Sequence, residues 1–237
     1  MCKLLQLIAC HLQKLFPVCF VFSQFLFSSI NYGQDLPLGY ISHYSQKANS
    51  TQFLSTLNIC TPQYWNIAND KSSTVLYPAV RDSIENRNFL LNMGVIKDMI
   101  FGEFILELDF RSSSPDSGVA GFCFLGPVKN PDTYYLFVLG HDSVTFFYVN
   151  KGIPEIIESK YLIVRNNSWN HVRVTRDILK RSVTFVLNKD PRTQVVFTDP
   201  RLVMGYTGFG TYITQSSIRN IDIWAPTAIT DTTFTCR

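Results

Sequence analysis

The pair of carboxylates at Glu107 and Asp109 is the strongest chemical signal in the sequence. Both lie in FGEFILELDFR, where apolar and polar residues alternate, and Arg111 follows on the same parity. A strand has a period of two, so we expect all three side chains on the face opposite the core. Two carboxylates on one face suit acid and base chemistry or hydrogen bonding to a ligand. The alternative is a plain solvated face.

Two histidines extend this set. His171 lies on the polar parity of NHVRVTRD, beside Trp169 and Arg173, and His141 lies in the short turn GHDS. An imidazole at the rim of a sheet can act as a general base or contact a sugar, although a single histidine in a turn is most often a solvated turn residue. The candidate catalytic residues are Glu107, Asp109 and His141.

Aromatic residues near predicted loops offer a second kind of contact. Their faces stack on the apolar side of sugar rings, but the same rings could instead close the ends of a sandwich. The aromatic residues concerned are Tyr134, Tyr135, Tyr206, Phe209 and Tyr212. Together with the polar residues above, the candidate ligand-binding residues are Glu107, Asp109, Arg111, Tyr135, His141 and His171.

The sequence predicts no metal and no cofactor. Asp116 and Ser117 lie in the turn SSSPDSG, but a lone aspartate with a serine makes a poor calcium site. Cys60, Cys123 and Cys236 lack the paired spacing of a zinc site. Three cysteines outside the first 34 residues allow one disulfide at most. If one forms, we expect it between Cys60 and Cys236, with Cys123 as a buried thiol.

Short strands separated by turn signals run through the chain. Residues 101–149 contain four, which we interpret as consecutive antiparallel strands. Further strands are expected in TPQYWNIAND, STVLYPAV, RNFLLNMGVI, NHVRVTRD, SVTFVLN, TQVVFTD and SIRNIDIWAP, and Pro78 marks an edge strand or a strand end. No apolar pattern of helical period is longer than two turns. The predicted fold class is all-β, a two-sheet antiparallel β-sandwich of the jelly-roll type.

The first 34 residues differ from the rest. Lys3 and Lys14 precede an apolar run of roughly a dozen residues, the order of a secretory signal peptide. A membrane anchor is the alternative, but a spanning helix needs about 20 apolar residues, so we expect no stable membrane insertion after leader removal. The expected location is secreted or in the cell envelope, periplasmic or extracellular. We expect an N-terminal extension or edge strand at 35–61, the sandwich at 62–226 and a C-terminal tail at 227–237.

Composition supports one large all-β domain or two small ones in a chain of 237 residues. Aromatic residues make up 14% and charged residues 16%, which leaves ample material for a core. The net charge is +3, and two of the basic residues lie in the leader. No basic cluster is present, so we expect no nucleic-acid partner.

The order of motifs resembles the concanavalin A-like lectin/glucanase superfamily. The segments that carry the resemblance are FGEFILELDFRSSSPDSGVAGFCF, SWNHVRVTRD, SVTFVLN and GYTGFGTYITQSSIRNIDIW, within residues 62–226. The pattern is most similar to the 3-keto-disaccharide hydrolase-like and LamG-like jelly rolls of exported bacterial proteins. This fold hosts lectins, hydrolases and adhesion modules alike. The resemblance therefore implies the sandwich more specifically than it implies an activity.

The resemblance also bears on the carboxylates. Laminarinase-type members of the superfamily hold their carboxylates in E-x-D-x-x-E, and Ser112 stands here where the last glutamate would be. Retaining hydrolysis needs two carboxyl groups about 5 to 5.5 Å apart, so this motif is incomplete and enzymatic activity stays open. The expected function is carbohydrate recognition on the polar face. The alternatives are a glycoside-active enzyme similar to the 3-keto-disaccharide hydrolases and a non-catalytic structural or adhesive envelope module.

Overall fold

The computed structural model describes residues 36–46, 53–59, 65–70, 73–78, 92–112, 120–125, 133–140, 142–201, 204–211 and 216–234. All of the strands fall in the unit Gly39–Arg237. The predicted leader, His141, Cys60 and Cys236 lie outside the described residues. None of the described segments forms a helix with the length and apolar character that a bilayer crossing requires.

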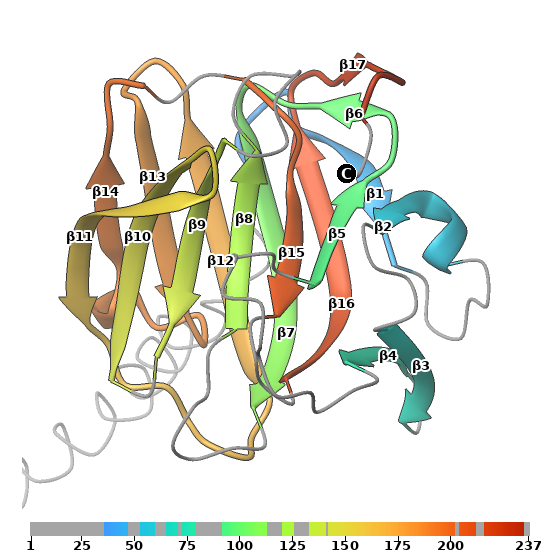
Figure 1. Cartoon of the computed structure of the whole chain (residues 1–237), viewed down its shortest axis with the longest axis vertical. Coiled ribbons are helices and arrows are strands. Elements are labelled where there is room, and N and C mark those ends of the chain that lie inside the picture. The colour runs from blue at the N-terminus through green and yellow to red at the C-terminus, as the bar shows by residue number, and fades with distance from the viewer. Residues whose placement is uncertain are drawn as a thin grey trace, which may run out of the picture. The chain divides into compact units, whose positions relative to one another are not determined.

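An eight-stranded antiparallel sheet forms one layer (Figure 1). Its strands, in spatial order, are β14 (Val195–Thr198), β13 (Ser182–Leu187), β12 (Asn170–Asp177), β7 (Phe104–Ser112), β16 (Ser216–Ala225), β4 (Ser73–Pro78) and β3 (Trp65–Asp70), with β1 (Ile41–Ser45) paired to β16. Strand β4 ends at Pro78, as expected of a residue that cannot donate to a ladder.

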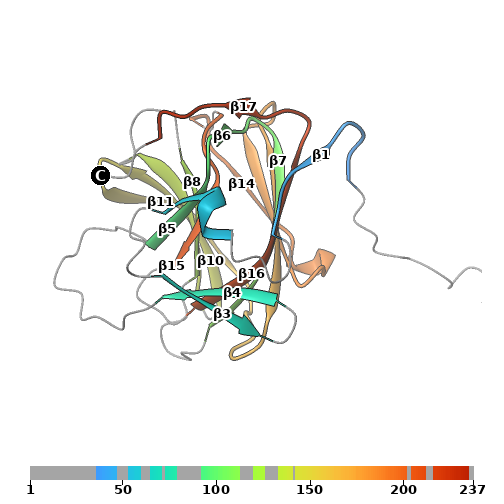
Figure 2. The ribbon, with the colours of Figure 1, turned by 90° about the vertical axis from the view of Figure 1, so that its right-hand side faces the viewer.

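A seven-stranded antiparallel sheet forms the second layer, and the view turned by 90° shows the two layers side by side (Figure 2). Its strands are β11 (Ile153–Tyr161), β10 (Ser143–Asn150), β9 (Tyr134–Leu139), β8 (Ala120–Leu125), β15 (Gly208–Thr211), β5 (Asn92–Ile96) and β2 (Leu57–Ile59). A small ladder joins β6 (Met99–Ile100) to β17 (Ile229–Thr230), and two 3-10 turns span Phe53–Thr56 and Pro191–Thr193. The predicted all-β, two-sheet antiparallel sandwich is confirmed.

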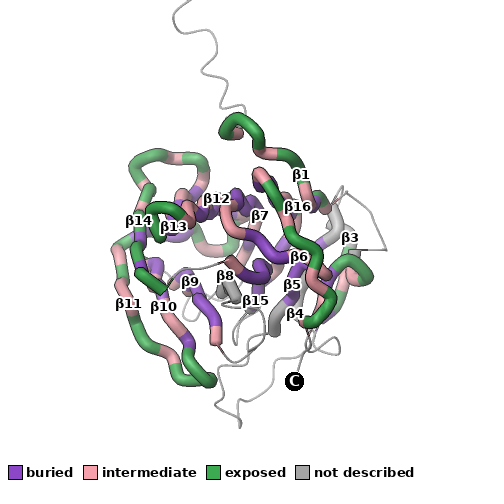
Figure 3. The backbone as a smooth tube through the Cα atoms, turned by 90° about the horizontal axis from the view of Figure 1, so that it is seen from above, coloured by how far each residue is buried: buried purple, intermediate pink, exposed green. Residues whose placement is uncertain are grey.

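Alternation along β7 divides its side chains between the core and the outer face. Phe104, Leu106, Leu108 and Phe110 are fully buried, and they belong to the core cluster that also takes in Phe137 of β9. The Phe137 ring stacks on Phe146 of β10 at 4.5 Å and meets Phe197 of β14 at 5.4 Å. Buried residues accordingly line the space between the two layers (Figure 3). The opposite parity of β7 therefore points away from this core.

The stretch 101–149 forms four strands, but they do not form one meander. Strands β8, β9 and β10 pair in sequence within the seven-stranded sheet, whereas β7 pairs with β12 and β16 in the other sheet. The chain thus crosses between the layers after β7. Alternation of apolar and polar residues predicts a strand but not the strand it pairs with. The interpretation of 101–149 as consecutive antiparallel strands was therefore wrong for β7.

Two further features differ from expectation. Strand β11 was not predicted, because it is an edge strand with exposed apolar residues such as Ile153 and Ile156 and shows no clean alternation. Tyr134, Tyr206 and Phe209 were expected to flank loops, yet all three are buried in the core clusters. The predicted extension at 35–61 contributes β1 and β2, and the tail contributes β17.

Candidate functional site

Polar side chains from three neighbouring strands meet on the outer face of the eight-stranded sheet. On one side of β7, Asp109 lies opposite His171 of β12 and Glu107 lies opposite Arg173. Because residues directly opposite each other on one face have neighbouring side chains, these four groups form a compact row. The register of β7 and β12 therefore assembles a site from two segments that are far apart in the sequence.

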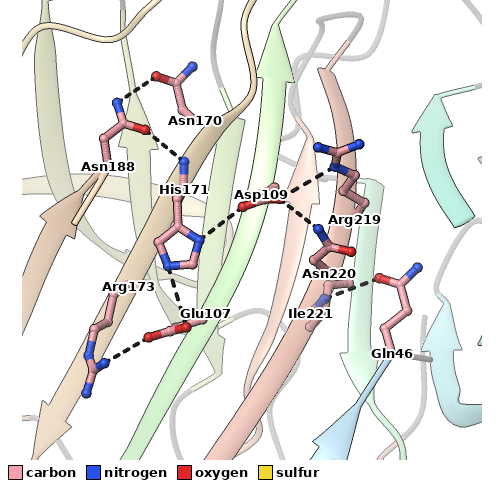
Figure 4. A network of polar contacts seen from close by, with 10 residues as sticks. All are labelled: Gln46, Glu107, Asp109, Asn170, His171, Arg173, Asn188, Arg219, Asn220 and Ile221. Atoms are coloured by element: carbon pink, nitrogen blue, oxygen red, sulfur yellow. Dashed lines mark hydrogen bonds and ion pairs between the residues drawn. The ribbon is translucent and has the colours of Figure 1, made fainter. Parts of the chain in front are cut away.

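The His171 imidazole lies between two carboxylates (Figure 4). Its Nδ1 is 3.0 Å from Oδ1 of Asp109, and its Nε2 is 3.5 Å from Oε2 of Glu107, an ion-pair distance. The guanidinium of Arg173 donates to Oε1 of Glu107 at 2.8 Å. Oδ1 of Asn188 accepts a hydrogen bond from the His171 backbone N–H at 2.9 Å. The ring is held from both sides.

A β-bulge in β16 completes the row from the other side. The register between β16 and β7 shifts between Arg219 and Asp222, and Asn220 within this shift has a φ of 53°. The bulge changes the direction in which the side chains of β16 point. As a result, Nδ2 of Asn220 donates to Oδ2 of Asp109 at 2.8 Å, and Nε of Arg219 lies 3.5 Å from the same oxygen. The side chain of Gln46 stabilises the bulge, because its Oε1 accepts a hydrogen bond from the backbone N–H of Ile221 at 3.2 Å.

Electrostatics fix the charge states of this row. Burial alone would lower the pKa of His171, but hydrogen bonds to Asp109 and Glu107 raise it to about 9. Burial opposes ionisation of Asp109, yet the bonds from His171 and Asn220 outweigh it and hold its pKa below the usual range. At neutral pH the row therefore contains an imidazolium and an ionised Asp109.

Asp222 behaves in the opposite way. Burial raises its pKa, a hydrogen bond with Ser45 lowers it, and the negative charges of Glu107 and Asp109 raise it further. Asp222 lies directly opposite Glu107 across the β7–β16 pair. The site thus contains carboxyl groups whose environments push their pKa values apart.

An aromatic ring with two cations lies next to this row. The guanidinium of Arg219 lies 3.9 Å from the ring centroid of Trp169, and that of Arg111 lies 4.7 Å from it. Trp169 is partly exposed at the start of β12. Cations over an indole face are attracted by its quadrupole, so the ring gathers two positive charges at one end of the row.

Three of the predicted residues, Glu107, Asp109 and His171, come together, and Arg111 lies on the same strand face beside Trp169. Tyr135 does not join them, because it belongs to β9 of the other sheet, is 2% exposed and stacks on Phe146 at 5.2 Å. His141 lies outside the described residues. The described chain has no group of three or more His, Cys, Asp or Glu side chains placed to hold a metal ion.

Sequence reasoning missed other members of the site, namely Gln46, Arg173, Arg219, Asn220 and Asp222. Arg173 shares the parity of His171, so alternation alone could have included it. The bulge hides the residues of β16, because it breaks the parity of SIRNIDIW and turns Arg219 and Asn220 toward the same carboxylate.

Comparison with known proteins establishes the fold. Neither a family model nor a curated protein matches the sequence. Among solved structures, the carbohydrate-binding module CBM66 from Bacillus subtilis is 15% identical, with 70% of this chain and 93% of that chain covered at a TM-score of 0.51. A putative glycosyl hydrolase from Parabacteroides distasonis is 14% identical, with coverages of 77% and 99% and a TM-score of 0.48. The chain has the concanavalin A-like jelly-roll fold, as its motifs predicted.

Proposed function

We propose that this protein binds a glycan on the outer face of its eight-stranded sheet, over β7, β12 and β16. The observation that carries the proposal is the row of Asp109, His171 and Arg173, whose side chains are held by one another and are still 18%, 22% and 25% exposed. Polar groups fixed before a ligand arrives lose little entropy on binding. The likeness to a structure titled as a carbohydrate-binding module supports the same assignment.

The charge states favour binding over catalysis at this row. A general base must be unprotonated near the working pH, whereas the pKa of His171 is raised to about 9. Glu107 is 3% exposed, and its carboxylate oxygens accept a hydrogen bond from Arg173 and form an ion pair with His171. A carboxylate whose oxygens are occupied in this way stabilises the sheet rather than takes part in proton transfer.

A glycoside-active enzyme is the second candidate, and Asp222 is the observation that favours it. Burial and the charges of Glu107 and Asp109 raise the pKa of Asp222, which lies directly opposite Glu107. Residues that face each other on adjacent strands have neighbouring side chains, and glycoside hydrolases use a pair of carboxyl groups that flank the scissile bond. Incubation with a 3-keto-glucoside separates the two functions, because a binding module leaves this substrate intact.

A glycan array with the full chain tests the proposal. We expect binding that is lost in Arg173→Ala and kept in Lys180→Ala, a control in the turn between β12 and β13 whose side chain is 79% exposed. Circular dichroism of each variant checks the fold. If no glycan binds to folded protein, or if both variants bind equally well, the proposal fails and a structural or adhesive module becomes the better assignment.

We also propose that the protein is exported, on the basis of the predicted leader at residues 1–34. Lys3 and Lys14 followed by an uncharged apolar run support a secretory signal. Mass spectrometry of the protein recovered from its host tests this directly. A mature form that begins near residue 35 is expected, and an intact N-terminus in a cytoplasmic fraction would contradict export.

A further inference from the structure

We infer that the glycan held by this face is acidic, and that its sugar carboxylate binds Arg111 beside Trp169. The inference rests on the proposed glycan-binding function and deepens it by naming the class of ligand. It is based on a comparison of the hydrogen-bond donors and the acceptors on this face that remain available to a ligand.

The acceptors at the centre of the face are already in use. In Asp109, Oδ1 lies 3.0 Å from the His171 imidazole, and Oδ2 accepts from Asn220 at 2.8 Å. In Glu107, Oε1 accepts from Arg173 at 2.8 Å, and Oε2 faces His171. A neutral sugar presents hydroxyls that both donate and accept, and such ligands need free acceptors in the protein. These two carboxylates have little capacity left for them.

Donors, in contrast, remain available. A guanidinium carries five N–H donors, and Arg173 uses one of its nitrogens, Nη1, on Glu107. Within the described residues, the interaction found for Arg111 is its position 4.7 Å from the Trp169 ring centroid, with no hydrogen bond or ion pair. The face therefore suits a ligand that supplies acceptors.

The charges around the row point the same way. Four cationic side chains and three carboxyl groups lie here. The cations are Arg111, His171, Arg173 and Arg219, and the carboxyl groups are those of Glu107, Asp109 and Asp222. Trp169 holds the guanidiniums of Arg111 and Arg219 against one ring, which places two like charges close together. An anion bound next to them would offset this repulsion.

A carboxylate fits this end of the site better than other anions do. A planar guanidinium pairs with a carboxylate through two parallel N–H···O bonds, an arrangement that lysine cannot reproduce. Arg111 projects from the same parity of β7 as Asp109, at the Trp169 end of the row. Arg173 lies opposite Glu107, four residues along β7 from Arg111, so its remaining donors would meet a further sugar unit of the same acidic chain.

Binding of polygalacturonate to the full chain, followed by isothermal calorimetry and by tryptophan fluorescence, tests the inference. A neutral β-glucan and dextran sulfate of similar length serve as comparison ligands. We expect binding of polygalacturonate that weakens roughly ten- to hundredfold in Arg111→Gln and weakens in about 0.5 M salt. Lys180→Gln removes the same charge in the turn between β12 and β13 and should change affinity by less than about twofold.

The outcomes separate this inference from the proposed function. Equal or tighter binding of the neutral glucan, or an equal loss in Arg111→Gln and Lys180→Gln, overturns the acidic assignment and leaves glycan binding in place. If dextran sulfate binds and polygalacturonate does not, the assignment of a carboxylate as the anionic group of the ligand is wrong. If no polysaccharide binds to folded protein, the proposed function falls and the inference falls with it. Arg111→Lys checks geometry, because it keeps the charge and should recover only a small part of the affinity.

Discussion

Nδ1 of His171 lies 3.0 Å from Oδ1 of Asp109, directly across the β7–β12 pair and 62 positions away in the sequence. The other ring nitrogen faces Glu107 at 3.5 Å, so one imidazole joins the two carboxylates that alternation places on the outer face. This contact determines the charge of the site, because it keeps the imidazole protonated at neutral pH.

The free energy of unfolding should fall as the pH rises toward 9. The pKa of His171 is raised from 6.5 in the unfolded chain to about 9 in the folded protein, so its contribution is complete below pH 6.5 and is lost as the pH passes through 9. We expect a loss on the order of 2 to 3 kcal/mol in urea denaturation across this window. In His171→Gln this part of the slope should disappear, and an NMR titration of His171 with a midpoint near 6.5 would contradict the prediction.

Removing the charge of Asp109 should lower the pKa of His171. Asp109→Asn loses the ion pair while keeping the shape of the side chain, and we expect a destabilisation of about 1 to 3 kcal/mol because a partly buried imidazolium loses a partner. A double-mutant cycle with His171→Gln should give a coupling energy of about 0.5 to 3 kcal/mol. A coupling near zero would mean that the contact contributes nothing to stability.

Gly208 should not tolerate a side chain. A Cβ at this position would overlap the carbonyl oxygen of Gly94 and lie 2.8 Å from Cα of Val95, both backbone atoms of the paired strand β5. We therefore expect Gly208→Ala to destabilise the protein by about 3 kcal/mol or more, measured by thermal unfolding. Gly102→Ala is the matched control, because its Cβ would make an ordinary contact of 3.6 Å with Ile178, and a loss there of similar size would contradict the steric explanation.

Tyr135 should be a core residue without a part in ligand binding. Its ring stacks on Phe146, and burial together with the neighbouring Asp199 carboxylate raises the pKa of its hydroxyl. Tyr135→Phe removes the contact with Asp199, so it should lower the free energy of unfolding by about 0.5 to 1.5 kcal/mol and leave glycan affinity unchanged. Tyr135→Ala should instead cost about 3 to 5 kcal/mol through the cavity it creates. A loss of glycan binding in a folded Tyr135→Phe variant would show that the residue contacts the ligand.

Alternation predicted a large part of what matters here. It identified β7 as a strand with Phe104, Leu106, Leu108 and Phe110 toward the core and Glu107 and Asp109 on the other face, and it placed His171 on the polar parity of β12. These properties are local, because a pleated strand sends successive side chains to opposite faces whatever it pairs with. The motifs that gave the superfamily resemblance also predicted the fold correctly.

Alternation could not predict which strands pair or which aromatic side chains are buried. Tyr135, Tyr206 and Phe209 are aromatic residues of strands and connections whose exposure depends on what packs over them, and the structure buries all three. The bulge at Arg219 and Asn220 likewise gives no signal in an alternating segment. Such features depend on long-range neighbours, which periodicity in a single strand does not contain.

The sequence alone determined that Glu107, Asp109 and His171 lie on polar faces of strands, since a period of two requires it. Only the tertiary structure decided that these faces belong to adjacent strands of one sheet, because β7 leaves its neighbours in sequence to pair with β12 and β16. That pairing turns separate polar residues into one clamped row, in which the charge of each group is set by the partner that the register places opposite it.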